Sequence, residues 1–229
     1  MARNKYPEIT EQRILDSAYK LFIEKGWENT TIQDIIDDLG DLSRGAFYHH
    51  FKSKEDIIDA VTSRFFTNDN PFEIVEKDCS YNGLNKLKKV LVLFLTNENN
   101  IELVRRLPST VRNSPQLIAK QVDECKTVLA PYFQKLIEDG VNDGSVNVKY
   151  PKQIAEMFSY LITLWVSPKY VNTDETEFVN VIDAFSIVLM GIGLPLIDKD
   201  IKDLCIQVFR RIAKDQIDRG VINGIRMED

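Results

Sequence analysis

The residues best suited to chemistry lie in one short stretch, SRGAFYHHFKSK, at positions 43–54. It holds one arginine, two lysines, a tyrosine and both histidines of the chain, and it contains no acidic residue. An arginine fork matches the acceptors on guanine, small residues allow close approach to bases, and phenol, imidazole and ammonium groups donate to phosphate oxygens. The stretch therefore predicts contact with DNA.

Metal binding and catalysis are weaker interpretations of the same residues. His49 and His50 are neighbours, so on a helix their side chains point about 100° apart, and neither has a ligand-type residue four positions away. A histidine-dependent nucleophile would have to be assembled around an exposed helix that lacks a pocket. The chain also carries no P-loop and no dinucleotide-binding glycine motif. We therefore expect no metal, no cofactor and no enzymatic activity.

Two short helices must position the stretch. Apolar residues at helical spacing predict the first, which opens at Thr30, with a capping box to Gln33, and ends at Gly40. Ser43 is placed to cap the second, which runs through Phe51. A short helix, a tight turn and a second short helix form the helix-turn-helix pattern, which lays its second helix in the major groove of DNA.

The spacing of residues on the second helix predicts its faces. Phe47 and Phe51 are four positions apart, so they share a face and are expected to pack inward. The residues then expected to face outward are Arg44, Gly45, Ala46, Tyr48 and His49. Lys52 and Lys54 come at the start of the next helix, where the helix dipole and the ammonium groups would both attract phosphate.

Two further helices flank this pair. Thr10 is placed to cap a helix whose apolar stripe ends at Gly26. Ser53, with Asp56 three residues later, is placed to open another helix that carries Ile57, Ile58 and Val61. The sequence thus predicts four helices within residues 1–67.

Two segments, TTIQDIIDDLG (30–40) and LSRGAFYHHFKSKEDII (42–58), carry a resemblance to a known family. They are similar to the signature of the tetracycline-repressor (TetR) family of one-component transcriptional regulators. The resemblance implies an all-α fold in which three N-terminal helices bind DNA and a fourth links them to a larger helical domain. That domain would bind a small ligand, and two of its helices would pair into the four-helix bundle of a homodimer.

The resemblance also implies roles for individual residues. Thr31 and Gln33 would approach DNA from the second helix, whereas bases would be read by Arg44, Gly45 and Ala46 and phosphates would be held by Tyr48, His49 and Lys54. One feature departs from the family pattern, which usually places a single residue between the turn glycine and the serine of the recognition helix. Here Asp41 and Leu42 both stand between Gly40 and Ser43, so the turn is one residue longer.

Beyond residue 67 the sequence predicts a second helical domain. The segment NDNPFEIVEKDCSYNG (68–83) interrupts the helical pattern, which places the domain boundary near its start and divides the chain into 1–67 and 68–229. Helices are expected at about 84–98, 101–107, 115–140, 152–167, 175–194 and 199–219. The segments near 152–167 and 175–194 are apolar on more than one face, which predicts that a second copy of the chain covers them.

The effector of this second domain is an unknown small molecule. The aromatic candidates for its pocket are Phe94, Phe133, Phe158 and Trp165, although aromatic residues are more often simple core residues. Arg105 would favour an anionic ligand if it faced the interior, whereas a solvated surface position is the commoner alternative.

Charge and composition limit these interpretations. Residues 1–67 hold nine Lys and Arg against twelve Asp and Glu, a net of −3, so we expect weak non-specific DNA binding and a dependence on dimerisation. The N-terminus has no apolar signal region, and the longest apolar run, at 185–197, is too short to span a membrane, so we expect a cytoplasmic protein. Cys79, Cys125 and Cys205 lack disulfide or zinc spacing and are expected to be small buried hydrophobes.

Two functions remain open on the sequence. The first is a ligand-responsive regulator, most simply a repressor, that binds a palindromic double-stranded DNA operator as a homodimer and is released by its effector. The second is a helical small-molecule-binding protein that acts through a protein partner without specific DNA binding. The sequence alone names neither the effector nor the operator.

Overall fold

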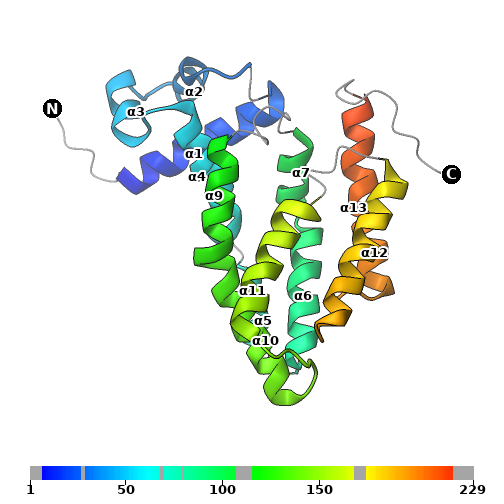
Figure 1. The fold of residues 1–229 in the computed structure, drawn as a ribbon. Coiled ribbons are helices and arrows are strands. Elements are labelled where there is room, and N and C mark those ends of the chain that lie inside the picture. The colour runs from blue at the N-terminus through cyan, green and yellow to red at the C-terminus, as the bar shows by residue number, and fades with distance from the viewer. Residues whose placement is uncertain are drawn as a thin grey trace. The chain divides into compact units, whose positions relative to one another are not determined.

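The computed structural model describes residues 7–26, 29–67, 70–78, 80–106, 115–167 and 174–218. Every regular element in these residues is a helix, so the expected all-α fold class is confirmed (Figure 1). The chain divides into two compact units. Among the described residues, one unit consists of those up to Asn70 together with Arg106, and the other consists of the remainder from Pro71 onward. We call them the N-terminal and C-terminal units. None of the described helices is both long and apolar enough to cross a membrane.

The N-terminal unit contains four helices: α1 (Pro7–Glu24), α2 (Ile32–Leu39), α3 (Arg44–His50) and α4 (Lys54–Thr67). Helix α1 packs against both α2 and α4. Their shared core consists of apolar side chains that are almost wholly buried, namely Ile14, Leu15, Ala18, Leu21, Phe22, Ile35, Ile36, Phe47, Phe51, Ile57, Ile58 and Val61. The inward packing expected of Phe47 and Phe51 is therefore confirmed, and it fixes which face of α3 is exposed.

Two of the expected helix starts are wrong. Helix α1 begins at Pro7, not at a Thr10 cap, because the fixed φ of proline suits the first turn and its missing N–H costs nothing there. Helix α2 is capped by Thr31 with Asp34, not by Thr30 with Gln33. The Thr30 hydroxyl is buried and donates instead to the carbonyl oxygens of Leu21 and Gly26, so this residue ties the end of α1 to the start of α2.

The other two caps are confirmed. The Ser43 hydroxyl accepts a hydrogen bond from the Ala46 N–H at 3.2 Å and starts α3. Ser53 and Asp56 form a reciprocal pair before α4, in which the Asp56 N–H donates to the Ser53 hydroxyl and the Ser53 N–H donates to the Asp56 carboxylate. These local bonds satisfy helix-end donors and fix where α3 and α4 begin.

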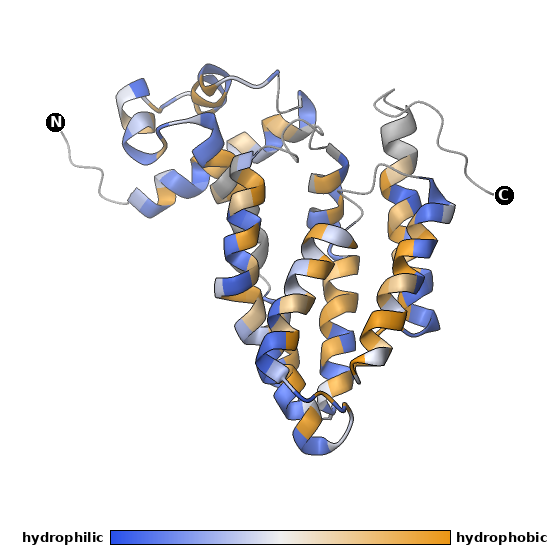
Figure 2. Ribbon diagram, in the orientation of Figure 1, coloured by the Kyte–Doolittle hydropathy of each residue, from blue (hydrophilic) through white to orange (hydrophobic). Residues whose placement is uncertain are grey.

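The C-terminal unit is larger. Its helices are α5 (Pro71–Glu76), α6 (Gly83–Thr96), α7 (Glu98–Arg106), α9 (Pro115–Glu124), α10 (Ala130–Asp143), α11 (Pro151–Tyr160), α12 (Glu175–Gly191) and α13 (Lys199–Asp218). Helix α10 packs between α6 and α11, and α13 contacts both α6 and α12. Hydrophobic residues run along most of α6 and along the second half of α12 (Figure 2).

The helical pattern of this unit differs from the expectation in two respects. The interrupted segment contains the short helix α5, because Phe72 and Val75 are buried against the rest of the unit. Two helices expected to be regular each contain a π-helical turn, η1 (Cys125–Leu129) between α9 and α10 and η2 (Leu161–Trp165) after α11. Both π turns insert a local change of register, for which the apolar spacing carries no signal.

Two buried polar groups of the C-terminal unit meet where α11 contacts η1. The Ser159 hydroxyl donates to the carbonyl oxygen of Cys125 at 3.0 Å, and the Cys125 thiol donates to that of Ser159. Cys205 is also buried, which raises the pKa of its thiol to about 12. Cys125 and Cys205 are thus buried as expected, whereas Cys79 lies outside the described residues.

Candidate nucleic-acid interface

The exposed face of α3 carries the side chains that the sequence singled out. Arg44, Gly45, Tyr48 and His49 are exposed, and Ala46 is half-buried. Tyr48 packs its ring edge-on against the buried ring of Phe47, at 5.6 Å between centroids. The arrangement places an arginine and two small residues in the first turn of α3, and a phenol and an imidazole in the next turn. Such a surface has donors for both base edges and phosphate oxygens.

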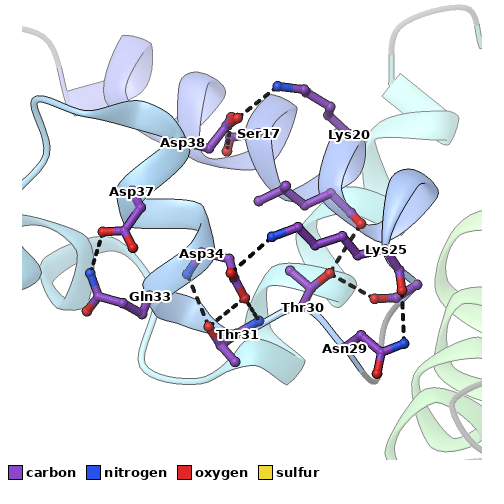
Figure 3. A network of polar contacts seen from close by, with 12 residues as sticks. Ser17, Lys20, Lys25, Asn29, Thr30, Thr31, Gln33, Asp34, Asp37 and Asp38 are labelled. Atoms are coloured by element: carbon purple, nitrogen blue, oxygen red, sulfur yellow. Dashed lines mark hydrogen bonds and ion pairs between the residues drawn. The ribbon is translucent and has the colours of Figure 1, made fainter.

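Arg44 is connected to the preceding helix through a chain of two hydrogen bonds. Its Nε–H donates to Oε1 of Gln33 at 2.9 Å. The amide nitrogen of Gln33 then donates to Oδ1 of Asp37 at 2.7 Å, one turn further along α2 (Figure 3). Gln33 therefore lies against Arg44, and the two residues form one polar surface across α2 and α3. Thr31, the other α2 residue singled out, is exposed and engaged in capping.

The start of α4 places Lys52 and Lys54 beside this surface in the same unit. Lys52 is exposed and Lys54 is half-buried. The Asp56 carboxylate accepts hydrogen bonds from the backbone N–H groups of Lys52 and Ser53, at 2.9 and 3.2 Å. These two backbone donors are therefore already bonded within the protein.

Two acidic residues of α2, Asp34 and Asp38, are paired with lysines on α1 or directly after it, whereas Asp37 is bonded to Gln33. Lys25 contacts Asp34 at 3.1 Å and Lys20 contacts Asp38 at 2.8 Å, and the Ser17 hydroxyl donates to Asp38 at 2.7 Å (Figure 3). Hydrogen bonds from the Thr31 side chain and backbone, and then from Lys25, lower the pKa of Asp34 to about 2. The pKa of Asp38 is lowered by its hydrogen bonds from Lys20 and Ser17.

A third pair joins α1 to the lengthened turn. The guanidinium of Arg13 donates to both carboxylate oxygens of Asp41, at 2.6 and 3.1 Å, and this bond lowers the pKa of Asp41. Gly40 just before it has φ 71°, a conformation that favours glycine, and the Asp41 N–H donates to the carbonyl of Leu39. The additional turn residue is thus held against α1. Sequence reasoning missed this role, although Arg13 and Lys20 lie seven positions apart and so share one face of α1.

These pairs explain where the acidic excess of the N-terminal unit lies. Asp34, Asp38 and Asp41 contact Lys25, Lys20 and Arg13 respectively, and Asp56 caps α4, whereas residues 43–54 contain no acid. Among the described residues, no three His, Cys, Asp or Glu side chains are grouped so that they could hold a metal ion. The surface on α3 and the adjoining ends of α2 and α4 is therefore a polar, cation-bearing surface.

The ligand candidates of the C-terminal unit fall into two places. Phe133 and Phe158 are buried and pack edge-to-face at 4.8 Å between centroids. Ring contacts through Phe72 connect Phe133 to Phe94, and ring contacts through Phe185 connect Phe158 to Trp165. Arg105 instead lies on α7, where its guanidinium is bonded to Glu102 at 2.7 Å. The four aromatic candidates thus form one row.

Comparisons with known proteins agree with this geometry. Residues 14–61 match the family profile described as bacterial regulatory proteins, tetR family. The chain is 30% identical over 194 residues to the HTH-type transcriptional repressor KstR2 of Rhodococcus jostii (strain RHA1). This alignment covers 80% of this chain and 90% of the relative. It is 24% identical over 169 residues to IcaR of Staphylococcus aureus (strain Newman), a negative transcriptional regulator of the biofilm operon icaADBC, covering 73% and 86%.

Solved structures match the same fold. A TetR-family transcriptional regulator from Pectobacterium atrosepticum has a TM-score of 0.57 at 20% identity, covering 84% of this chain and 98% of that chain. Salmonella enterica GusR has a TM-score of 0.56 at 18% identity, covering 93% and 100%. At these identities the structural matches bear on the fold alone.

Proposed function

The chain belongs to the tetR family of bacterial regulatory proteins, and from that premise we propose that it is a homodimeric, ligand-responsive repressor of a palindromic DNA operator. Two of its relatives, KstR2 and IcaR, are a repressor and a negative regulator of transcription, and we therefore propose that this protein also represses transcription. The proposal has three parts, which concern the DNA contacts, the dimer and the effector.

The DNA contacts are assigned from the exposed surface of the N-terminal unit. Arg44, with Gly45 and Ala46 in the first turn of α3, reads base edges in the major groove, and Gln33 approaches the same groove from α2. Thr31 approaches DNA from the start of α2, and phosphates are held by Tyr48, His49, Lys52 and Lys54. The single observation that carries this assignment is the exposed, cation-bearing face of α3, with Phe47 and Phe51 buried behind it.

The homodimer is assigned from apolar side chains that the C-terminal unit leaves uncovered. Helix α12 buries Phe178, Ile182, Phe185 and Leu189, yet Ile187 is 71% exposed and Met190 is 64% exposed on the same helix. Val188 and Trp165 of η2 are also exposed. A second copy that pairs α11, η2 and α12 with their counterparts would cover these side chains in a four-helix bundle and give the two-fold symmetry of a palindrome.

The effector is assigned to the C-terminal unit. The row of aromatic rings that includes Phe94, Phe133, Phe158 and Trp165 offers apolar lining, and Arg105 on α7 offers a cation for an anionic group. A ligand that prefers the conformation with the wrong spacing between the two recognition helices releases the operator, because it shifts the equilibrium by its differential affinity.

Selection from a random duplex library tests the function. The purified protein at near-physiological salt is expected to enrich a palindrome, and replacement of Arg44 and Tyr48 by alanine is expected to abolish the enrichment. Enrichment that survives in the Arg44→Ala, Tyr48→Ala variant would contradict the assigned contacts. No enrichment by the wild-type protein would contradict the function and favour a helical sensor that acts through a protein partner.

A further inference from the structure

The orientation of Arg44 depends on a residue that lies outside the expected contact set. Asp37 accepts a hydrogen bond from the amide nitrogen of Gln33 at 2.7 Å, and Gln33 accepts one from Nε of Arg44 at 2.9 Å. We propose that Asp37 is a positioning residue for sequence recognition, which fixes the Gln33 amide so that its oxygen holds the Arg44 guanidinium. This inference rests on the proposed function, in which Arg44 reads a base.

Each hydrogen bond between Arg44, Gln33 and Asp37 has a fixed direction. An ionised carboxylate only accepts hydrogen bonds, whereas the amide of glutamine has one end that donates and one that accepts. Asp37 therefore selects the nitrogen end of the Gln33 amide, which leaves the oxygen end for Arg44. Arginine only donates, so only one orientation of the Gln33 amide can satisfy both Arg44 and Asp37.

The Arg44 guanidinium is planar. Its five N–H donors lie in one plane, so a hydrogen bond at Nε restricts how that plane can turn and leaves the two terminal nitrogens at its outer end. Within the described residues those terminal nitrogens make no hydrogen bond, and they form the fork that matches O6 and N7 of guanine. An arginine ordered before binding loses less conformational entropy when it meets the base.

Asp37 can act on DNA binding through its charge and through its hydrogen bond to Gln33. Asp37 is exposed and negative, so its charge alone would repel the phosphates of bound DNA. Loss of the negative charge of Asp37 would thus strengthen binding to every DNA sequence. Loss of its positioning hydrogen bond to Gln33 would instead weaken the recognition of one base pair. The two effects have opposite signs, and they can be measured apart.

The first experiment uses no DNA, so it judges the inference even if the function were wrong. In nitrogen-15-labelled protein, the Nε–H of Arg44 is expected to exchange slowly with solvent, and Asp37→Asn is expected to speed this exchange. The asparagine amide can donate to the Gln33 oxygen and compete with Arg44 there. Unchanged exchange in Asp37→Asn, in a variant with an unaltered circular dichroism spectrum, would overturn the inference.

The second experiment uses the operator obtained by selection. For the base pair that Arg44 contacts, wild-type discrimination against a substituted operator is expected to be roughly tenfold or more, and about threefold or less in Asp37→Asn. Affinity for random duplex is expected to be equal or higher in the variant. The matched control is Glu55→Gln, which removes one exposed carboxylate from the start of α4 and leaves discrimination unchanged.

A double variant provides the rescue. Gln33→Glu alone sets two carboxylates against each other and is expected to lose discrimination. Combined with Asp37→Asn, the new carboxylate accepts from both the asparagine amide and Arg44, and discrimination is expected to return. Loss in both single variants without rescue would contradict the positioning role, as would full discrimination in Asp37→Asn. A wild-type protein that selects no palindrome would refute the proposed function, and the exchange of the Arg44 Nε–H would still decide the inference.

Discussion

Arg13 and Asp41 form a two-bond ion pair, with N–O distances of 2.6 and 3.1 Å, that ties the first helix to the turn before the recognition helix. Asp41 occupies the turn that is one residue longer than in the family signature. The carboxylate therefore gives the longer turn an anchor on α1. Since Ser43 and Arg44 follow directly, the anchor also helps to fix where α3 begins.

The ion pair is expected to affect DNA recognition more than stability. Both side chains are exposed, and exposed pairs contribute little to folding, so Asp41→Asn should lower the melting temperature by no more than about 3 °C. Operator affinity should fall several-fold because the start of α3 loses its anchor. Calorimetry and operator titration measure the two effects. A matched control is Glu11→Gln, an exposed carboxylate of α1; an equal loss of affinity there would point to charge rather than to the anchor.

Asp34 makes the N-terminal unit less stable at low pH. Its pKa is lowered from the usual 3.8 to about 2 by Thr31 and Lys25, so the folded state binds this proton less readily than the unfolded chain does. The stabilisation is complete above the unfolded value and is lost as the pH falls from about 4 through 2. Asp38 and Asp41 shift in the same direction.

Urea titrations at pH 5 and pH 3 measure this effect. The urea concentration at the midpoint of unfolding should be lower at pH 3 than at pH 5 for the wild-type protein. The decrease should be smaller in Asp34→Asn, which has no proton to take up at this position. Asp16→Asn is a control on α1, outside the α1–α2 ion pairs described above. If Asp34→Asn showed the full wild-type pH dependence, the assigned origin of the lowered pKa would be wrong.

Gly83 lies directly against the backbone of Gly140 in the C-terminal unit. A Cβ atom on Gly83 would lie 2.1 Å from the backbone nitrogen of Gly140, and the backbone cannot give way as a side chain would. Gly83→Ala is therefore expected to destabilise the protein by about 2–4 kcal/mol, measured by chemical denaturation. A loss below about 1 kcal/mol would mean that α6 and α10 are free to separate here.

Replacement of Gly45 by alanine is expected to have the opposite effect on stability. Gly45 lies in the exposed first turn of α3, and a Cβ there would meet no atom within 4 Å. Gly45→Ala should therefore stabilise the helix by about 0.5–1 kcal/mol, because alanine loses less backbone entropy. If this glycine lets the backbone approach the bases, operator affinity should fall at the same time. Stability and affinity that rise together would contradict the close approach.

The local features of the site were predictable from the sequence, whereas the pairings between helices were not. Ser43, Ser53 and the buried faces of Phe47 and Phe51 depend on neighbours within four positions. The choice of Thr31 over Thr30 as the α2 cap depends on the carbonyls of α1 that hold Thr30, and these are set by tertiary packing.

Longer-range features had no readable signal in one sequence. Arg13 and Asp41 are 28 positions apart, and their contact requires the crossing of α1 over the turn. The π turns η1 and η2 interrupt helices whose apolar spacing looks regular. The family prediction, by contrast, is confirmed, because the signature lies in one contiguous stretch whose match extends over residues 14–61.

The exposed apolar residues of α12 provide the sharpest test of the dimer. Ile187 is 71% exposed, so Ile187→Glu should leave each unit folded while placing a charge inside the proposed four-helix bundle. Analytical ultracentrifugation should then show a monomer, and operator binding should be lost because one recognition helix contacts only a half-site. Ile74→Glu on α5 is the matched control, since Ile74 is also an exposed isoleucine, and it should remain dimeric. A dimeric Ile187→Glu protein would exclude α12 from the interface and, with it, the proposed arrangement of the two recognition helices.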